Sequence, residues 1–190
     1  MSRVDPHFLK QINQRREAAF DKLVREHQES VVRYLTKMIG DREVATDLGQ
    51  DVFLTAFRFA DGFRGECSPK SWLFKIAGNL CKNKFRYRDR RKHNKQDSIE
   101  EMLETSGMEP GANPGDSPEQ IILGRELEEL VNKGIMSLAM DYREVLILRD
   151  IELMSYDEIA DLTGLARGTV KSRLHRARFQ LTDYLEKNGG

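Results

Sequence analysis

One acidic segment, residues 96–118, interrupts a chain that is otherwise patterned for helices. It contains no Lys or Arg, and Pro and Gly recur along it. A stretch of low hydrophobicity with many Pro and Gly cannot offset the entropy of ordering the backbone, so we expect a flexible linker here. The 190-residue chain is then predicted to be all-α, with two small helical domains on either side of this linker.

The first unit, residues 17–95, shows apolar side chains at helical spacing and no β-like alternation. One helix is predicted to end at Gly40, a second to begin at Asp41 or Thr46, and a third to begin at Ser68 with Pro69 in its first turn. The apolar face expected for this third helix is Trp72, Leu73, Ile76, Ala77, Leu80 and Tyr87. Residues 1–16 form an N-terminal extension to this unit.

The second unit, residues 119–187, ends in two short helices joined by a tight turn. Ser155 and Glu158 have the spacing of a capping box, which starts the first of these helices. Gly164 can adopt the left-handed conformation that ends it. In the second helix an apolar stripe recurs at i, i+4, i+7 and i+11, and it consists of Val170, Leu174, Ala177 and Leu181.

The face opposite this stripe is polar and basic, and no acidic residue occurs between Thr163 and Thr182. The outward residues are Thr169, Ser172, His175, Arg176 and Phe179, flanked by Lys171 and Arg178. A solvated basic hairpin in another all-helical protein would carry a similar charge. The capping box, the turn glycine and the second amphipathic helix together favour a helix-turn-helix whose second helix enters the DNA major groove.

The net charge of zero is a cancellation, because a basic run from Lys82 to Lys95 precedes the acidic linker. Two rings and two amides lie within or beside this run: Phe85, Tyr87, Asn79 and Asn83. Stacking rings, cations for phosphates and amides for base edges are typical of proteins that bind single-stranded nucleic acid. The alternative is an ordinary solvated charge run, with Trp72 as a core anchor.

The sequence lacks the patterns of enzymes, metal sites and exported proteins. Cys67 and Cys81 have no closely spaced partner, so we expect two reduced thiols and no metal, with a redox switch through Cys67 as a minor alternative. No phosphate-binding loop, metal cluster or Ser/His/Asp arrangement is present, which excludes the usual enzyme classes. We expect no cofactor, no signal region and no membrane insertion, and therefore a cytoplasmic protein.

Both units resemble one family, the bacterial sigma-70 initiation factors, and in particular the extracytoplasmic-function (ECF) group. The first unit carries the resemblance in AFDKLVREHQ, ATDLGQDVFLTAFRFADGFRGE and SWLFKIAGNLCKNKFRYRDRRK, and the second in SLAMDYREVLILRDIELMSYDEIADLTGLARGTVKSRLHRARFQL. The resemblance implies that residues 17–95 are region two and residues 119–187 region four. It also implies a non-catalytic factor that directs core RNA polymerase to promoters and helps to melt them.

The resemblance carries roles over to individual positions. Polymerase binding, on the β′ clamp helices, is implied for Asp47, Leu48, Gln50, Asp51 and Phe53, with region four on the β flap. Recognition of the minus-ten element is implied for Phe63, Arg64, Lys75, Asn79, Lys82, Asn83 and Arg86, the loop 63–68 capturing a flipped base. Recognition of the minus-thirty-five element is implied for Arg167, Thr169, Lys171, Ser172, Arg173, His175, Arg176 and Arg178. Promoter DNA and an anti-sigma protein are the other implied partners.

Within the second helix of the helix-turn-helix, Ser172 and Arg176 are the expected base-edge contacts, and Lys171, Arg173 and Arg178 the expected backbone contacts. Ala166 stands where the family often has a better cap, which predicts a less well capped recognition helix. Gly78 and Asn79 are poor helix formers, which favours a functional position over a packing one. A stand-alone regulator with a signal-sensing N-terminal unit remains the alternative function.

Overall fold

The structure, a computed structural model, describes residues 6–63, 65, 67–94 and 117–189. Every regular element in these ranges is a helix, which confirms the expected all-α fold. The linker segment 96–116, Arg64 and the first five residues lie outside the described residues. Side chains are described for most of these ranges, but not for residues 6–16, 61, 88–94 or 118–121.

The first unit consists of three helices, α1 (Pro6–Ile39), α2 (Arg42–Phe59) and α3 (Pro69–Asn94), with a short 3-10 turn, η1 (Ala60–Gly62), after α2. Gly40 has a φ of 85° and ends α1, and Asp41 caps α2 by accepting a hydrogen bond from the Val44 amide at 3.0 Å. The Ser68 hydroxyl accepts from the Ser71 amide at 3.1 Å, as expected for the cap of α3. Local capping therefore sets these boundaries.

The second unit begins with α4 (Pro118–Ser137) and α5 (Met140–Leu146). A π-helical turn, η2 (Ile147–Ile151), then leads to α6 (Tyr156–Thr163) and α7 (Arg167–Asn188). The predicted capping box is present, with the Ser155 amide 2.8 Å from a Glu158 carboxylate oxygen and the Glu158 amide 3.2 Å from the Ser155 hydroxyl. Gly164 ends α6 at a φ of 72°, so the predicted helix-turn-helix is confirmed.

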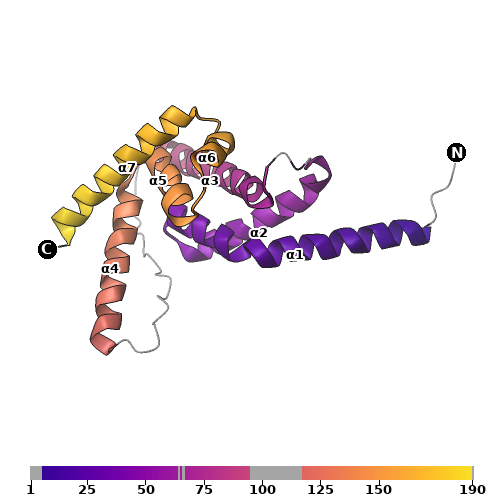
Figure 1. Cartoon of the computed structure of the whole chain (residues 1–190), viewed down its shortest axis with the longest axis horizontal. Coiled ribbons are helices and arrows are strands. Elements are labelled where there is room, and N and C mark those ends of the chain that lie inside the picture. The colour runs from indigo at the N-terminus through magenta and orange to yellow at the C-terminus, as the bar shows by residue number, and fades with distance from the viewer. Residues whose placement is uncertain (1–5, 64, 66, 95–116, 190) are drawn as a thin grey trace.

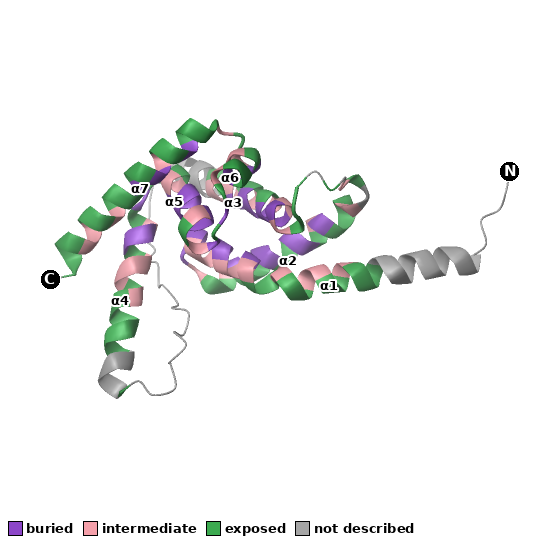
Figure 2. Ribbon diagram, viewed as in Figure 1, coloured by how far each residue is buried: buried purple, intermediate pink, exposed green. Residues whose placement is uncertain are grey.

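The two units pack directly against each other, and their buried apolar residues form one cluster (Figure 2). In Figure 1, α5 and α6 lie against the first unit, and α6 contacts α3 while α4, α5 and η2 contact α1. The N-terminal part of α1 extends away from this body. The predicted tether thus joins two units that are in contact rather than apart.

Two expectations for the packing faces were wrong. The buried face of α3 consists of Leu73, Phe74, Ala77 and Cys81. Tyr87, expected on that face, is 61 % exposed. Gly78 is a packing position, because a Cβ there would lie 3.0 Å from a carboxylate oxygen of Glu144 in the second unit. The glycine allows a close approach between units, which sequence spacing alone does not reveal.

Candidate nucleic-acid interface

The polar face of α7 is exposed because the opposite, apolar face of the helix is buried. Val170, Leu174 and Ala177 are at most 2 % exposed and pack α7 against α5 and α6. This leaves a set of predicted DNA-contacting side chains exposed along one side of the helix: Arg167, Thr169, Lys171, Ser172, His175 and Arg176. An open groove between α7 and the start of α5 is lined by Thr169, Ser172, Arg173 and Arg176, together with Met140 and Tyr142. Hydroxyl and guanidinium groups at such a groove match the donors and acceptors of base edges.

Two predicted backbone-contacting arginines are already held by acidic side chains of the same unit. An Arg173 guanidinium nitrogen lies 2.9 Å from Asp141, and Arg178 binds both carboxylate oxygens of Asp150, with its Nε 2.9 Å from Oδ2. The hydrogen bonds that Arg178 donates to Asp150 raise the pKa of Arg178. These pairs brace α7 against α5 and η2. The sequence did not indicate this role, because the partners are 32 and 28 positions apart along the chain.

The N-terminus of α7 has no side-chain cap. Ala166 occupies the N-cap position without a cap hydrogen bond, as predicted for this residue. Arg167 instead lies 3.4 Å from Asp157 in α6, and the Lys171 ammonium lies over the Tyr156 ring at 5.6 Å from its centre. Contacts with α6 therefore position the start of the recognition helix in place of a cap.

A second polar face lies on α3 of the first unit. Lys75, Asn79, Asn83 and Arg86 are exposed and recur at helical spacing along one side. Lys82 departs from this set, because its ammonium lies 2.9 Å from the buried carboxylate of Glu144. That Lys82 contacts DNA stays a prediction; in the packed arrangement its ammonium is paired with a carboxylate of the second unit.

The loop before α3 presents an aromatic pair. The Phe63 and Trp72 rings stack with centres 4.8 Å apart and planes tilted by 31°, and both side chains are half-buried. Gly65 has a φ of 72°, a turn conformation that L residues with side chains rarely adopt. Arg64, the other predicted loop residue, lies outside the described residues.

The predicted polymerase-binding residues of α2 fall into two groups. Asp47, Gln50 and Asp51 are exposed, whereas Leu48 and Phe53 are 8 % and 9 % exposed and belong to the core. Phe53 also lines a predominantly apolar groove of about 470 Å³ between α1 and α2. The other lining residues are Phe20, Val24, Gln28, Val32, Thr46, Gly49, Gln50, Leu54 and Phe57. Leu54, 55 % exposed, is a surface residue that the helical pattern did not single out.

Comparison with known protein families accounts for both units. The profile described as sigma-70 region 2 matches residues 23–91, and that described as sigma-70, region 4 matches residues 125–181. The chain belongs to the sigma-70 family. It is a transcription initiation factor, and the family is non-catalytic. Membership of this family decides against the alternative of a stand-alone regulator.

Two curated relatives of this sigma factor are similar to it in length, and one of them is named as an ECF factor. The ECF RNA polymerase sigma-E factor of Haemophilus influenzae is 32 % identical over 182 residues, which cover 96 % of this chain and 95 % of the relative. The RNA polymerase sigma-H factor of Pseudomonas aeruginosa is 32 % identical over 174 residues, covering 92 % of this chain and 90 % of the relative. These similarities support the ECF assignment along nearly the whole chain.

Solved structures of sigma factors share this fold. The sigma factor RpoE, crystallised with the anti-sigma factor NepR from Bartonella quintana, superimposes with a TM-score of 0.71 at 26 % identity, covering 90 % of this chain and 98 % of that one. CnrH, solved with the cytosolic domain of CnrY, gives a TM-score of 0.65 at 23 % identity, with 90 % of each chain covered. None of the helices among the described residues of this sigma factor is long and apolar enough to cross a membrane.

Proposed function

We propose that this sigma factor reads a two-element promoter with two different surfaces, duplex DNA with α7 and melted DNA with α3 and the loop before it. The observation that carries the proposal is the exposed cationic face of α7, which is opposed to an apolar face buried in its own unit. A helix displayed in this way can enter the major groove without disturbing its supports.

For the minus-thirty-five element, we assign base contacts to Ser172 and Arg176, which line the groove beside α7. Thr169 and His175 lie on the same exposed face, and Arg167 and Lys171 are placed to contact phosphates. Arg173 and Arg178 keep the backbone role predicted for them, with the added role of bracing α7 through Asp141 and Asp150. A guanidinium that is shared with a carboxylate supplies less attraction to phosphate than a free one.

For the minus-ten element, the exposed row of Lys75, Asn79, Asn83 and Arg86 is suited to a single strand, since amides can pair with base edges and cations with phosphates. The stacked Phe63 and Trp72 rings stand at the entry to α3, where an unstacked base has an aromatic neighbour. Arg64 remains part of this proposal through the family resemblance. Capturing a base offsets part of the cost of unstacking it, which is a few kcal/mol.

We assign the binding of core polymerase to the exposed edge of α2. Asp47, Gln50 and Asp51 offer polar contacts beside the apolar groove between α1 and α2, where Leu54 provides exposed apolar surface. The β flap is assigned to region four. A cytoplasmic location, with the polymerase, follows from this function. The solved complexes of sigma factors with anti-sigma proteins support an anti-sigma partner for this chain as well.

The test is transcription by core polymerase on fragmented genomic DNA, with start sites mapped for the wild type. On a promoter found in this way, Arg176→Ala should lose about 1–3 kcal/mol of discrimination at the minus-thirty-five element. Gln180→Ala, an exposed change on the same helix outside the groove, is the matched control.

Asn79→Ala should slow open-complex formation on duplex DNA and have little effect on a pre-melted template. Equal losses on both templates would contradict a role in melting. A protein that binds duplex DNA tightly without polymerase and never supports initiation would overturn the whole proposal.

A further inference from the structure

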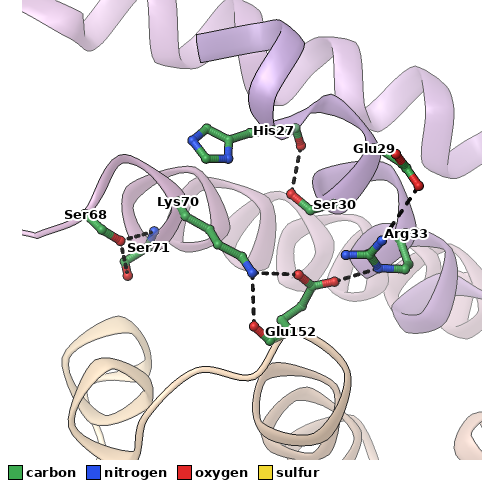
Figure 3. Close-up of polar contacts among 8 residues, drawn as sticks. All are labelled: His27, Glu29, Ser30, Arg33, Ser68, Lys70, Ser71 and Glu152. Carbon is green, nitrogen blue, oxygen red and sulfur yellow. Dashed lines mark hydrogen bonds and ion pairs between the residues drawn. The ribbon is translucent and has the colours of Figure 1, made fainter.

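A fully buried carboxylate joins the two units at their contact. Glu152 follows η2 in the second unit, and its side chain has no exposed surface. Its Oε1 lies 3.0 Å from Nε of Arg33 in α1, and its Oε2 lies 3.0 Å from Nζ of Lys70 in α3 (Figure 3). Lys70 also donates a hydrogen bond to the Glu152 backbone carbonyl at 3.0 Å. One acidic residue of region four is thus clamped by two helices of region two.

A second carboxylate repeats this arrangement nearby. Glu144 in α5, 3 % exposed, has its Oε2 2.9 Å from the Lys82 ammonium of α3. Its other oxygen lies in the space left by Gly78, close to the Tyr34 hydroxyl of α1. Burial, and then the neighbouring carboxylate, raise the pKa of Tyr34, so the hydroxyl stays protonated. Both carboxylates therefore come from one unit and all their partners from the other.

The energetics of these contacts favour a reversible association. A buried carboxylate without a partner costs several kcal/mol, so Glu144 and Glu152 are tolerated at the contact only while the cations are in place. When the units separate, the carboxylates and the cations all return to water, which offsets most of the lost attraction. Arg33, Lys70 and Lys82 keep 30–35 % of their side chains exposed in the packed form. The pairs thus specify one arrangement without making it permanent.

The packed arrangement is incompatible with binding both promoter elements at once. Elements centred near positions minus ten and minus thirty-five are about 25 base pairs apart, or roughly 85 Å along B-DNA. Here α6, the first helix of the helix-turn-helix, lies directly on α3. Lys82, a predicted minus-ten contact, is also engaged by Glu144. The units must therefore move apart before a promoter can be read, a step that rests on the proposed function.

We propose that Glu144 and Glu152 form an intramolecular latch that holds this sigma factor in a closed form, so that the chain restrains its own promoter-binding surfaces without an inhibitor protein. Opening exchanges the contacts with Arg33, Lys70, Lys82 and Tyr34 for water. Polymerase, by binding the separated units, draws the equilibrium toward the open form. The latch lowers the apparent affinity for polymerase by the fraction of molecules that are open.

The conformational test uses the full-length protein without polymerase or DNA. Spin labels at Arg58→Cys in α2 and Gln180→Cys in α7, both exposed positions, report the distance between units in a Cys67→Ser background. The wild-type latch should give one narrow distance. Glu144→Gln/Glu152→Gln should add a longer, broad population, with the closed-to-open ratio falling roughly tenfold or more.

The matched control is Glu126→Gln/Glu129→Gln, which removes the same charge from the exposed surface of α4 and should keep the narrow distance. Lys70→Gln attacks the Glu152 contact from its partly exposed side, so a test remains if the double Glu variant fails to fold. A narrow distance that survives both the double Glu variant and Lys70→Gln would overturn the latch, as would a broad distribution in the wild type.

A second arm measures binding to core polymerase. Opening the latch should tighten the apparent affinity of Lys70→Gln in proportion to its open fraction, and leave that of the control unchanged. Unchanged affinity together with an opened distance distribution would overturn the restraint on polymerase binding. Failure of the wild type to support transcription would instead count against the proposed function, because the distance measurement involves neither polymerase nor promoter.

Discussion

At the scale of single residues, the two cysteines occupy opposite environments. Cys67 is exposed in the loop before α3, whereas Cys81 has no exposed surface and lies on the buried face of that helix. Burial, reinforced by the nearby carboxylate of Glu144, raises the pKa of Cys81 to about 12. Since the thiolate is the reactive form, Cys81 is inert at neutral pH for two reasons, occlusion and protonation.

This difference predicts a simple titration. At pH 8 the native protein should react with Ellman's reagent at one thiol per chain, Cys67→Ser should show none, and the denatured wild type should show two. The high pKa of Cys81 also makes the folded state hold its proton more tightly than the unfolded state does. Stability from this thiol is therefore complete below its unfolded pKa, near 9, and is lost as the pH rises toward 12. A native titre of two would contradict the packing of α3.

At the scale of elements, α6 shows why the ends of a helix can be predicted from local sequence. An eight-residue helix is too short to be stable alone, so it depends on its caps and on two buried contacts, Ile159 and Leu162. The capping box and the left-handed Gly164 lie within the same ten residues, and sequence spacing reveals both. The brace between Arg178 and Asp150 connects α7 to η2 across 28 positions and leaves no such local signal.

The capping box predicts a measurable loss of stability. Ser155→Ala should lower the free energy of unfolding by about 0.5–2 kcal/mol, because the Glu158 amide loses its acceptor. Asp161→Ala, an exposed change on the same helix, should have a smaller effect. Chemical denaturation followed by circular dichroism measures both. Equal losses for the two variants would argue that helix propensity, rather than the cap, is being measured.

The free energy of unfolding at acid pH tests the same cap. Hydrogen bonds from Ser155 lower the pKa of Glu158 below its ordinary value of 4.5. The carboxylate therefore stabilises the folded protein above its unfolded pKa, and this contribution is lost as the pH falls through the lower, folded value. The stability difference between the wild type and Glu158→Gln should shrink below about pH 4.5. A difference that stays constant down to pH 3 would contradict this assignment.

At the scale of the whole molecule, one buried arginine ties the units together from within. The Arg143 guanidinium donates to the Ile135 carbonyl at 3.1 Å and to the Leu138 carbonyl at 3.0 Å, at the end of α4. It also donates to the Met38 carbonyl in the last turn of α1 at 2.6 Å. A planar group with donors on several sides is suited to serving carbonyls from two helices at once. Helix ends from both units thus share one cap.

Loss of this shared cap should be costly. Arg143→Met should lower the free energy of unfolding by roughly 3 kcal/mol or more, because several buried carbonyls lose their donor. Arg143→Lys keeps the charge but lacks the planar, multiply donating guanidinium. It should therefore recover only part of the lost free energy of unfolding. Arg125→Met, an exposed change on α4, is the control. A loss below 1 kcal/mol for Arg143→Met, measured by urea denaturation, would show that water replaces the guanidinium.

What the sequence determined by itself is local. Helix ends at Asp41, Ser68 and Ser155, the turn at Gly164 and the apolar stripe of α7 depend on residues within about four positions of each other, so spacing and residue type suffice. The family resemblance extended this to the two sigma regions. The same reasoning also located the exposed polar faces of α3 and α7, because the face opposite an apolar stripe is exposed.

Only the tertiary structure decided which of those side chains are available. Lys82 and Gly78 were assigned to function from their own helix, yet Glu144, more than 60 positions away, determines the surroundings of both. Glu152 meets Arg33 across 119 positions. Such pairs are set by how whole helices approach one another, and the free energy of burying a charge depends on all the groups that surround it. Local spacing carries no record of that environment, and so the closed arrangement of the two units became visible only in the folded molecule.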